Sequence, residues 1–122
     1  MSMRSCFQSL FYRNSRRKIV VAQLRIYTIN RGMMASWLQL FYEHIRPLHE
    51  RLGMPVQNAW VNAERTEFIW VRSFNDREEI EAKEAAYFAS PERTALGDQP
   101  TRHIAKIEVR VMEEVPATAG VS

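Results

Sequence analysis

The sequence predicts an α+β domain in which helices cover one face of an antiparallel β-sheet. Three observations lead to this fold class. Segments with the two-residue period of strands and segments with helical periodicity follow one another in the order βαββαβ. The 122 residues suffice for one domain with a single core, and 46% of them are apolar and 25% charged, which is the composition of a globular protein. The single cysteine, Cys6, excludes a disulfide framework.

The first strand and the first helix occupy residues 19–52. Residues 19–29 alternate between two faces and contain many β-branched residues, which predicts a strand. From Met34 to Leu52 the large apolar residues recur every three or four positions, which predicts a helix with one apolar stripe. Pro47 is expected to kink this helix, because proline cannot donate a backbone hydrogen bond to the preceding turn.

A hairpin and a second helix follow. Residues 56–63 and 67–74 predict two strands, and the three residues between them allow only a tight antiparallel turn. Asn75 is expected to cap a helix that runs to Phe88, with Glu78 bonding back to the cap. The inward residues expected on this helix are Ile80, Ala85 and Phe88.

A short helical turn and the last strand complete the body. Ser90 and Pro91 are typical of a helix start, and Gly97 closes the turn. Residues 103–112 alternate again and predict the fourth strand. With right-handed crossovers the βαββαβ order gives a ferredoxin-like domain, with an antiparallel four-stranded sheet whose first and third strands lie in the middle.

The basic charge of the chain belongs to its N-terminal segment. Residues 1–18 hold five of the 17 basic residues and none of the 14 acidic ones, so the body is slightly acidic. We read residues 1–18 as a basic tail, residues 19–115 as the domain and residues 116–122 as a loose C-terminal tail. The basic tail is an unstructured start, a mitochondrial transit peptide or a surface for a partner. A cytoplasmic location is expected, with a mitochondrial one as the alternative if the tail is a transit peptide.

Sorting the strand residues by face predicts one compact aliphatic layer and one amphipathic layer. The layer expected beneath the helices contains Leu24, Ile26, Ala59, Val61, Ile69, Val71, Ala105, Ile107 and Val109. The layer expected on the second face contains Gln23, Arg25, Tyr27, Asn58, Trp60, Asn62, Phe68, Trp70, Arg72, Lys106, Glu108 and Arg110. Exposed together, these aromatic residues would form a larger apolar patch than monomers usually show, so the second face needs a cover.

Three covers are conceivable: a second copy of the sheet, single-stranded nucleic acid, or the N-terminal tail. Nucleic acid is not expected as a partner, because the body is slightly acidic and the third strand lacks the basic and glycine-containing signature of RNA-recognition modules. An integral membrane association is not expected either, because no apolar stretch approaches the roughly 20 residues that cross a bilayer. A homodimer is the preferred interpretation.

Three blocks of the sequence resemble the NIPSNAP family. They are Leu24-Arg25-Ile26-Tyr27-Thr28-Ile29 followed by Arg31-Gly32, then Phe68-Ile69-Trp70-Val71-Arg72-Ser73-Phe74, then Tyr87-Phe88-Ala89-Ser90-Pro91-Glu92. The resemblance spans roughly residues 22–113 and implies a dimeric α/β barrel, in which two ferredoxin-like units join their sheets. Two positions depart from the family pattern: Ile80 stands where many members have an arginine, and Arg93 where they have a tryptophan. If those residues shape a ligand entrance in relatives, the entrance of this chain differs.

The residues expected to bind a ligand are Arg25, Tyr27, Trp60, Trp70 and Arg72. Two arginines beside aromatic rings suit an anion or carbonyl group in an aromatic cavity. The structural alternative is an interface ion pair, with Glu108 as the acid, together with stacking of arginine on tryptophan.

No residue stands out as catalytic, and Tyr27 and His103 are weak candidates for proton transfer. A metal site is not expected, since His44 and His49 are five residues apart instead of the four that suit zinc. No cofactor is expected, because the sequence contains no phosphate loop or nucleotide fingerprint.

These observations lead to three functional hypotheses. The first is a dimeric barrel protein that binds a small apolar or aromatic molecule in the barrel interior. The alternatives are a cofactor-independent monooxygenase or isomerase, as found among barrel relatives, and a non-catalytic interaction or scaffold protein. The sequence leaves open whether the protein is an enzyme.

Overall fold

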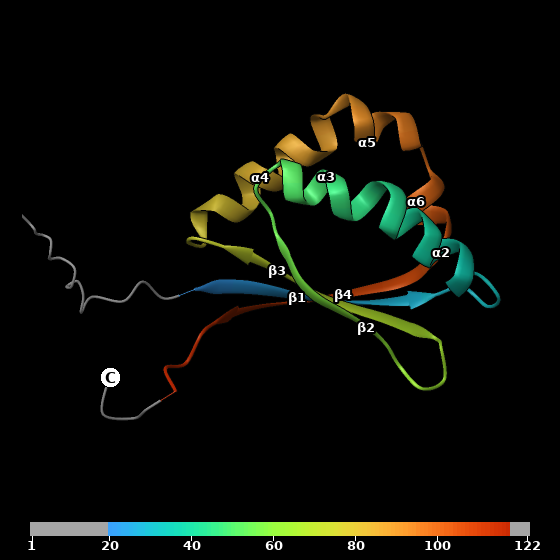
Figure 1. Ribbon diagram of the computed structural model, residues 1–122, viewed down its shortest axis with the longest axis horizontal. Coiled ribbons are helices and arrows are strands. Elements are labelled where there is room, and N and C mark those ends of the chain that lie inside the picture. The colour runs from blue at the N-terminus through green and yellow to red at the C-terminus, as the bar shows by residue number, and fades with distance from the viewer. Residues whose placement is uncertain (1–19, 118–122) are drawn as a thin grey trace, which may run out of the picture.

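The computed structural model describes residues 20–117, which form a four-stranded sheet with all helices on one side (Figure 1). The strands are β1 (Val21–Ile29), β2 (Val56–Val61), β3 (Glu67–Phe74) and β4 (Ile104–Glu113). Their order in the sheet is β2-β3-β1-β4, and every neighbouring pair is antiparallel. The predicted ferredoxin-like arrangement is therefore confirmed. The predicted basic tail, residues 1–18, lies outside the described residues, as do residues 118–122.

The predicted first helix is continuous, but a π-helical segment interrupts its α-helical hydrogen bonds. The segments are α2 (Met34–Leu40), η1 (Phe41–Ile45) and α3 (Arg46–Arg51). The backbone N–H of Arg46 donates to the carbonyl of Phe41, five residues earlier. Pro47 follows directly as the second residue of α3. The π-helical turn interrupts the regular ladder of hydrogen bonds just ahead of this proline, whose ring and missing N–H would disturb a regular α-helix. The expected kink is thus a local π-helical turn.

The second helical region consists of α4 (Glu78–Ala89), α5 (Pro91–Leu96) and α6 (Gln99–Arg102). The start of α4 is shifted by one residue from the predicted capping pair. The Asp76 carboxylate accepts from the Glu79 N–H at 3.0 Å, and the Glu79 carboxylate accepts from the Asn75 N–H at 3.1 Å. Ser90 caps α5 as expected, because its hydroxyl accepts from the Arg93 N–H.

The face assignment of the two central strands is the opposite of the sequence-based one. In the antiparallel register, Arg25 pairs with Trp70 and Val109, and Tyr27 pairs with Phe68 and Ile107, so these side chains share one face. We call this the helix face, because its residues pack against the helices: the Tyr27 ring lies 5.6 Å from Trp37 of α2. Its core is aromatic and contains the buried residues Tyr27, Trp37, Phe41, Phe68 and Trp70.

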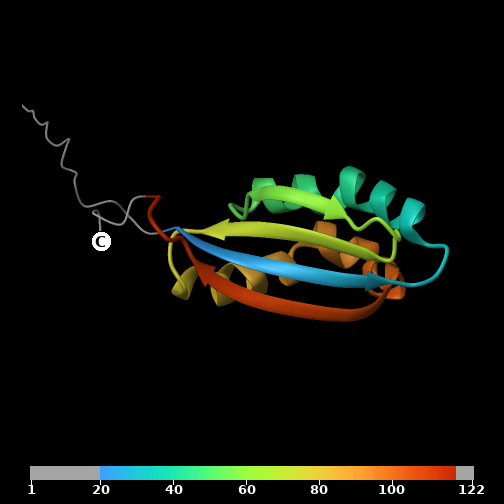
Figure 2. The ribbon, with the colours of Figure 1, turned by 90° about the horizontal axis from the view of Figure 1, so that it is seen from below.

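The other side of the sheet, the open face, has no helix over it among residues 20–117 (Figure 2). It carries Ala22, Leu24, Ile26 and Thr28 of β1, Asn58 and Trp60 of β2, Ile69, Val71 and Ser73 of β3, and Lys106, Glu108, Arg110 and Met112 of β4. The placement of Trp60, Lys106, Glu108 and Arg110 agrees with the sequence-based sorting. The placement of Leu24, Ile26, Ile69 and Val71 does not. None of the described helices is long and apolar enough to span a bilayer.

Candidate functional site

A cavity of about 90 Å³ lies between the helix face of the sheet and the helices. Its wall is mostly aromatic and aliphatic, with a few charged side chains. The lining residues are Arg25, Tyr27, Trp37, Ile45, His49, Trp70, Arg72, Glu84, Tyr87, Phe88, Arg93, Pro100, Thr101, Ile104 and Ile107. Since Phe88, Thr101 and Ile107 are exposed, the cavity reaches the surface of the protein between α4–α5 and α6–β4. An apolar pocket with a few polar groups is typical of a small-molecule site.

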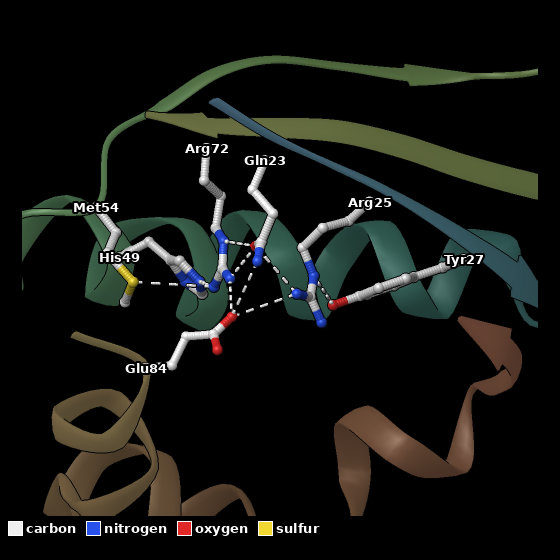
Figure 3. Close-up of polar contacts among 7 residues, drawn as sticks. All are labelled: Gln23, Arg25, Tyr27, His49, Met54, Arg72 and Glu84. Carbon is white, nitrogen blue, oxygen red and sulfur yellow. Dashed lines mark hydrogen bonds and ion pairs between the residues drawn. The ribbon is translucent and has the colours of Figure 1, made fainter. Parts of the chain in front are cut away.

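Arg72 of β3 is the most buried charge in this wall, with a side chain only 4% exposed. Its guanidinium donates to the Glu84 carboxylate of α4 and to the Gln23 side-chain oxygen of β1 (Figure 3). It also lies 5.6 Å from the centre of the Trp70 ring. Burial and the neighbouring Arg25 charge lower the pKa of Arg72, while Glu84 opposes this shift. A buried guanidinium needs such a carboxylate, because an unpaired buried charge is strongly unfavourable.

His49 of α3 is a neutral hydrogen-bond acceptor in this cluster. Its Nδ1 lies 2.9 Å from the Ile45 carbonyl, which can only accept, so Nδ1 carries the proton. Its Nε2 then accepts from the Arg72 guanidinium at 3.0 Å. Burial, followed by the charges of Arg72 and Arg25, lowers the pKa of His49 to about 4. The imidazole therefore holds Arg72 in place without adding a positive charge at neutral pH.

Arg25 and Tyr27 of β1 form the part of the cluster with free hydrogen-bond donors. The Arg25 Nε donates to the Tyr27 hydroxyl oxygen at 3.0 Å, and its Nη1 donates to Gln23 at 3.1 Å. Nη1 also lies 3.4 Å from the Glu84 carboxylate. Among the described residues, no acceptor lies within hydrogen-bond distance of the Arg25 Nη2 or of the Tyr27 hydroxyl proton. The indole N–H groups of the lining residues Trp37 and Trp70 are buried and also lack a partner there.

These groups give the cavity an excess of positive charge and of donors. Arg25 and Arg72 carry two positive charges, and Glu84 carries the one negative charge that pairs with them. His49 is neutral at pH 7. Burial also raises the pKa of Tyr87, which keeps that phenol protonated. A wall of this kind complements a ligand with one negative or strongly accepting oxygen on an apolar body.

Four of the five residues predicted to bind a ligand line this cavity: Arg25, Tyr27, Trp70 and Arg72. Trp60, the fifth, lies on the open face and is 51% exposed. The site is therefore formed by the sheet and the helices of a single chain, and not by the face that a second copy would cover. Glu108 also lies on the open face, where it contacts Lys106 and Arg110, so the acid that pairs with the arginines is Glu84.

The two candidates for proton transfer lie apart. Tyr27 lines the cavity, whereas His103 lines a separate surface pocket with Ser36. No group of three or more His, Cys, Asp or Glu residues within the described part of the chain is arranged to hold a metal ion.

Glu84, His49 and Gln23 belong to the cluster but were not among the predicted site residues. Glu84 belongs to the acidic run Glu78-Glu79-Glu81-Glu84, and such a run is most simply a solvated face of a helix. It lies four residues after Ile80 and three before Tyr87, and both of these neighbours face inward. His49 lies four residues after Ile45 on the apolar stripe of its helix. For Glu84 and His49, the helical spacing from inward-facing residues was thus the sequence signal that they also face inward.

Arg93, one of the two expected departures from the pattern of the resemblance, lines this cavity beside Phe88. The Arg93 guanidinium is 5.5 Å from the centre of the Phe88 ring and donates to the Gly97 carbonyl at 3.0 Å. Ile80, the other departure, packs in a second core cluster and does not line the cavity. Arg93 therefore gives this entrance a cation over aromatic rings.

Comparisons with known proteins agree with this architecture. The NIPSNAP family model matches residues 22–118. The chain is similar to the solved structure of a NIPSNAP domain protein from Burkholderia xenovorans, with a TM-score of 0.70, 16% identity, and coverage of 81% of this chain and 96% of that one. It is also similar to a NIPSNAP family protein from Agrobacterium tumefaciens, with a TM-score of 0.73, 18% identity, and coverage of 81% and 89%.

A more distant likeness links the fold to an enzyme. A solved structure described as an antibiotic biosynthesis monooxygenase matches with a TM-score of 0.59 and 17% identity, covering 79% of this chain and 99% of that one. At such identities the likeness concerns the fold alone. A search of the curated proteins finds no significant match.

Proposed function

Because the chain belongs to the NIPSNAP family, whose model matches residues 22–118, we propose that it is a small-molecule binding protein of this family. The ligand is an apolar or aromatic molecule with one carboxylate or carbonyl oxygen, and it binds in the cavity between the sheet and the helices. The observation that carries this proposal is a set of donors in an aromatic wall that have no acceptor among residues 20–117. The Nη2 of Arg25 and the hydroxyl proton of Tyr27 are the groups that would meet the ligand oxygen.

The size of the cavity limits the part of the ligand that it encloses. A dry cavity of roughly 150 Å³ holds one benzene ring, so a volume of about 90 Å³ encloses the acceptor oxygen and only part of a ring. The rest of the ligand extends past Phe88 and Arg93 at the open side. The exposed Phe88 ring, 61% accessible, offers a surface for this outer part.

The test is a fluorescence titration in which only the cavity tryptophans report. The Trp60→Phe variant removes the indole on the open face and leaves Trp37 and Trp70. Benzoate, salicylate and 1-naphthoate are titrated against benzamide, their uncharged counterpart. We expect the carboxylates to change the tryptophan emission and the change to saturate at a low ligand concentration. Benzamide is expected to bind at least tenfold more weakly.

Arginine variants locate the bound oxygen. Arg25→Met keeps the length of the side chain and removes the donors, so carboxylate affinity is expected to fall by roughly 10- to 100-fold. Arg110→Met, on the open face, is the matched control and leaves the affinity unchanged. A folded Trp60→Phe protein that responds to none of the carboxylates would contradict the proposal.

A second copy of the chain is the proposed cover of the open face, which makes the protein a homodimer. This face places the aliphatic residues Leu24, Ile26, Ile69 and Val71 beside the exposed Trp60 ring. Its β4 edge alternates in charge along Lys106, Glu108 and Arg110, and such a row complements its own copy across a twofold axis. Residues 19–115 are the proposed unit of this dimer.

Catalysis without a cofactor, as a monooxygenase or isomerase, is the second candidate function. The likeness to the antibiotic biosynthesis monooxygenase structure and the unpaired proton of Tyr27 favour it. Tyr27→Phe keeps the ring and removes the proton. Turnover of a cavity ligand that is lost in this variant, while binding persists, would support catalysis over binding alone.

The location of the protein and the role of residues 1–18 are separate proposals. We expect a cytoplasmic protein, and mass spectrometry of the native N-terminus tests this. A start at Met1 or Ser2 removes the mitochondrial alternative, and cleavage near residue 18 favours it. A third outcome concerns an interaction or scaffold role. If the full chain binds a partner protein and a chain without residues 1–18 does not, this role is favoured.

A further inference from the structure

Ser36 and His103 form a hydrogen-bonded pair away from the cavity. The Ser36 hydroxyl oxygen lies 2.7 Å from His103 Nε2, although the two residues are 67 positions apart in the chain. Ser36 is exposed in the first turn of α2, and His103 is only 4% exposed at the end of α6. A hydroxyl this close to an imidazole nitrogen is within the range of an activated nucleophile and its base.

The His103 ring is held in the tautomer that can act as a base toward Ser36. Its Nδ1 lies 2.7 Å from the Gln99 carbonyl, which can only accept a hydrogen bond. Nδ1 therefore carries the proton of the neutral ring, and Nε2 offers its lone pair to the Ser36 hydroxyl. A serine, a histidine and an acceptor that orients the histidine are the parts of a nucleophile–base relay.

The backbone around the pair fixes both residues in place. Asn30, between β1 and α2, makes two hydrogen bonds to the end of α6. Its N–H donates to the His103 carbonyl at 2.8 Å, and its side-chain amide donates to the Arg102 carbonyl at 2.9 Å. The ring of Trp37, next to Ser36 in the chain, lies 6.0 Å from the His103 ring. The loop before α2 and the end of α6 are thus tied together on each side of the pair.

Ser36 and His103 line a pocket of about 240 Å³. The wall is mostly polar and contains Ser36, Gln39, Leu40, Glu43, His44, Gln99, Arg102 and His103. None of these residues lines the cavity described above. The Arg102 guanidinium makes no hydrogen bond or ion pair with any residue among 20–117, which leaves a cation for a substrate oxygen.

We propose that Ser36 and His103 hydrolyse short-chain carboxylic esters in this pocket. The Ser36 oxygen bonds to the ester carbonyl carbon while its proton moves to His103 Nε2. The bond from that carbon to the alcohol oxygen then breaks, and His103 returns the proton to the leaving alcohol. Water next attacks the acyl-serine and gives a proton to His103, which passes it to the Ser36 oxygen as the carboxylic acid leaves. This reaction does not depend on the ligand proposed for the cavity.

The test uses the full chain and p-nitrophenyl acetate, with release of p-nitrophenolate as the readout. We expect Ser36→Ala and His103→Gln to lower the rate by roughly 100-fold or more, since each removes one partner of the relay. Two controls change exposed residues outside this pocket and keep the pair. Thr94→Ala removes an exposed hydroxyl, and Arg51→Gln removes an exposed charge; neither residue lines the pocket. Both controls are expected to retain the wild-type rate.

Covalent labelling separates chemistry from a purely structural contact. A fluorophosphonate probe is expected to label Ser36 in the wild-type chain, and peptide mass spectrometry identifies the site. Ser36 is exposed, so Ser36→Ala is expected to fold, and circular dichroism checks its folding. If His103→Gln does not fold, the proposal is tested by the rate of Ser36→Ala and by the labelling of Ser36. Hydrolysis that survives in folded Ser36→Ala, an equal loss in Thr94→Ala, or the absence of label on Ser36 each overturns the proposal.

Discussion

Glu84 supplies the negative charge that lets two arginines lie beneath the helices. Its carboxylate meets both the buried Arg72 and the Arg25 Nη1. Replacing it by glutamine keeps the shape but leaves two cations next to each other. We expect Glu84→Gln to lower the free energy of unfolding by about 2 kcal/mol, less than the roughly 3–5 kcal/mol of a fully buried pair, because Glu84 is 30% exposed. Urea denaturation measures this change.

An exposed ion pair of the same chemistry provides the control for Glu84. Glu92 and Arg51 are 3.1 Å apart with side chains about half exposed. Glu92→Gln is expected to change the free energy of unfolding by less than about 0.5 kcal/mol. Equal effects of the two substitutions would show that Arg72 does not depend on Glu84.

His49 makes the stability of the fold depend on pH. Its pKa in the fold is about 4, below the ordinary 6.5, because burial and the charges of Arg72 and Arg25 disfavour the imidazolium. The unfolded chain therefore binds a proton at a higher pH than the folded chain does, and acid favours unfolding. The contribution is complete above about pH 6.5 and is lost as the pH falls towards 4, by about 2 kcal/mol or more.

Two histidine variants isolate this contribution. Urea denaturation from pH 7 to pH 4 is expected to show a steeper loss of stability in the wild type than in His49→Gln. Carboxylates are present in both proteins, and their contributions cancel in the difference. His44→Gln, which removes an exposed imidazole, should behave as the wild type. Parallel pH profiles for the wild type and His49→Gln would refute the assignment.

Sequence patterns predicted individual site residues only where the residue type suggested chemistry. Arg25, Tyr27, Trp70 and Arg72 were identified as a group, because arginines beside aromatic rings are unusual on strands. Glu84 was missed, because an acidic residue in an acidic helix is normally solvated. Its role depends on Arg72 and Arg25 lying across from α4, and only the tertiary packing brings these three residues together.

At the scale of elements, the turn η1 lets one helix contain Pro47 without a break. The Arg46 N–H already bonds five residues back, and Pro47 follows at the second position of α3. We expect Pro47→Ala to change the free energy of unfolding by less than about 1 kcal/mol, because the preceding π-helical turn already opens the hydrogen-bond ladder that the proline would otherwise disrupt. A proline that strained the helix would instead give a gain of about 3 kcal/mol on removal.

Ala82 in the middle of α4 serves as the comparison for Pro47. It is exposed and lies five residues into an uninterrupted α-helix. Ala82→Pro is expected to cost about 3 kcal/mol or more, because it removes a backbone bond and inserts the ring into the preceding turn. Thermal unfolding followed by circular dichroism compares the two variants.

The elements themselves were predicted within a few residues, whereas the faces of the central strands were not. Strand, helix and turn signals are local in the chain, so β1–β4 and the helices follow from periodicity. On β1, Leu24 and Ile26 face one way and Arg25 and Tyr27 the other, so an aliphatic side stands against a side that mixes charged and aromatic residues. Alternation then shows that two faces exist but does not show which one the helices cover. The edge strands β2 and β4 have one clearly polar face each, and their placement was correct.

At the scale of the whole molecule, the proposed homodimer is tested through the open face. We expect the wild type to sediment as a dimer at micromolar concentration, with an interface near the standard of about 800 Å² per partner. Ile26→Asp places a carboxylate in the middle of this face, opposite Ile69, and is expected to give a single chain. Tyr42→Asp changes an exposed aromatic residue on the helical side and should remain dimeric. A monomeric wild type would contradict this prediction.

The strand β1 separates the cavity from the open face by the thickness of one backbone. Its odd-numbered side chains, from Gln23 to Tyr27, point to the helices, while its even-numbered side chains, Leu24 and Ile26, point away. On the two proposals above, we expect a scan of alanine substitutions along this strand to give alternating phenotypes, in which one position alters ligand affinity and the next alters self-association. Both faces of β1 would then restrict the substitutions that this short segment tolerates.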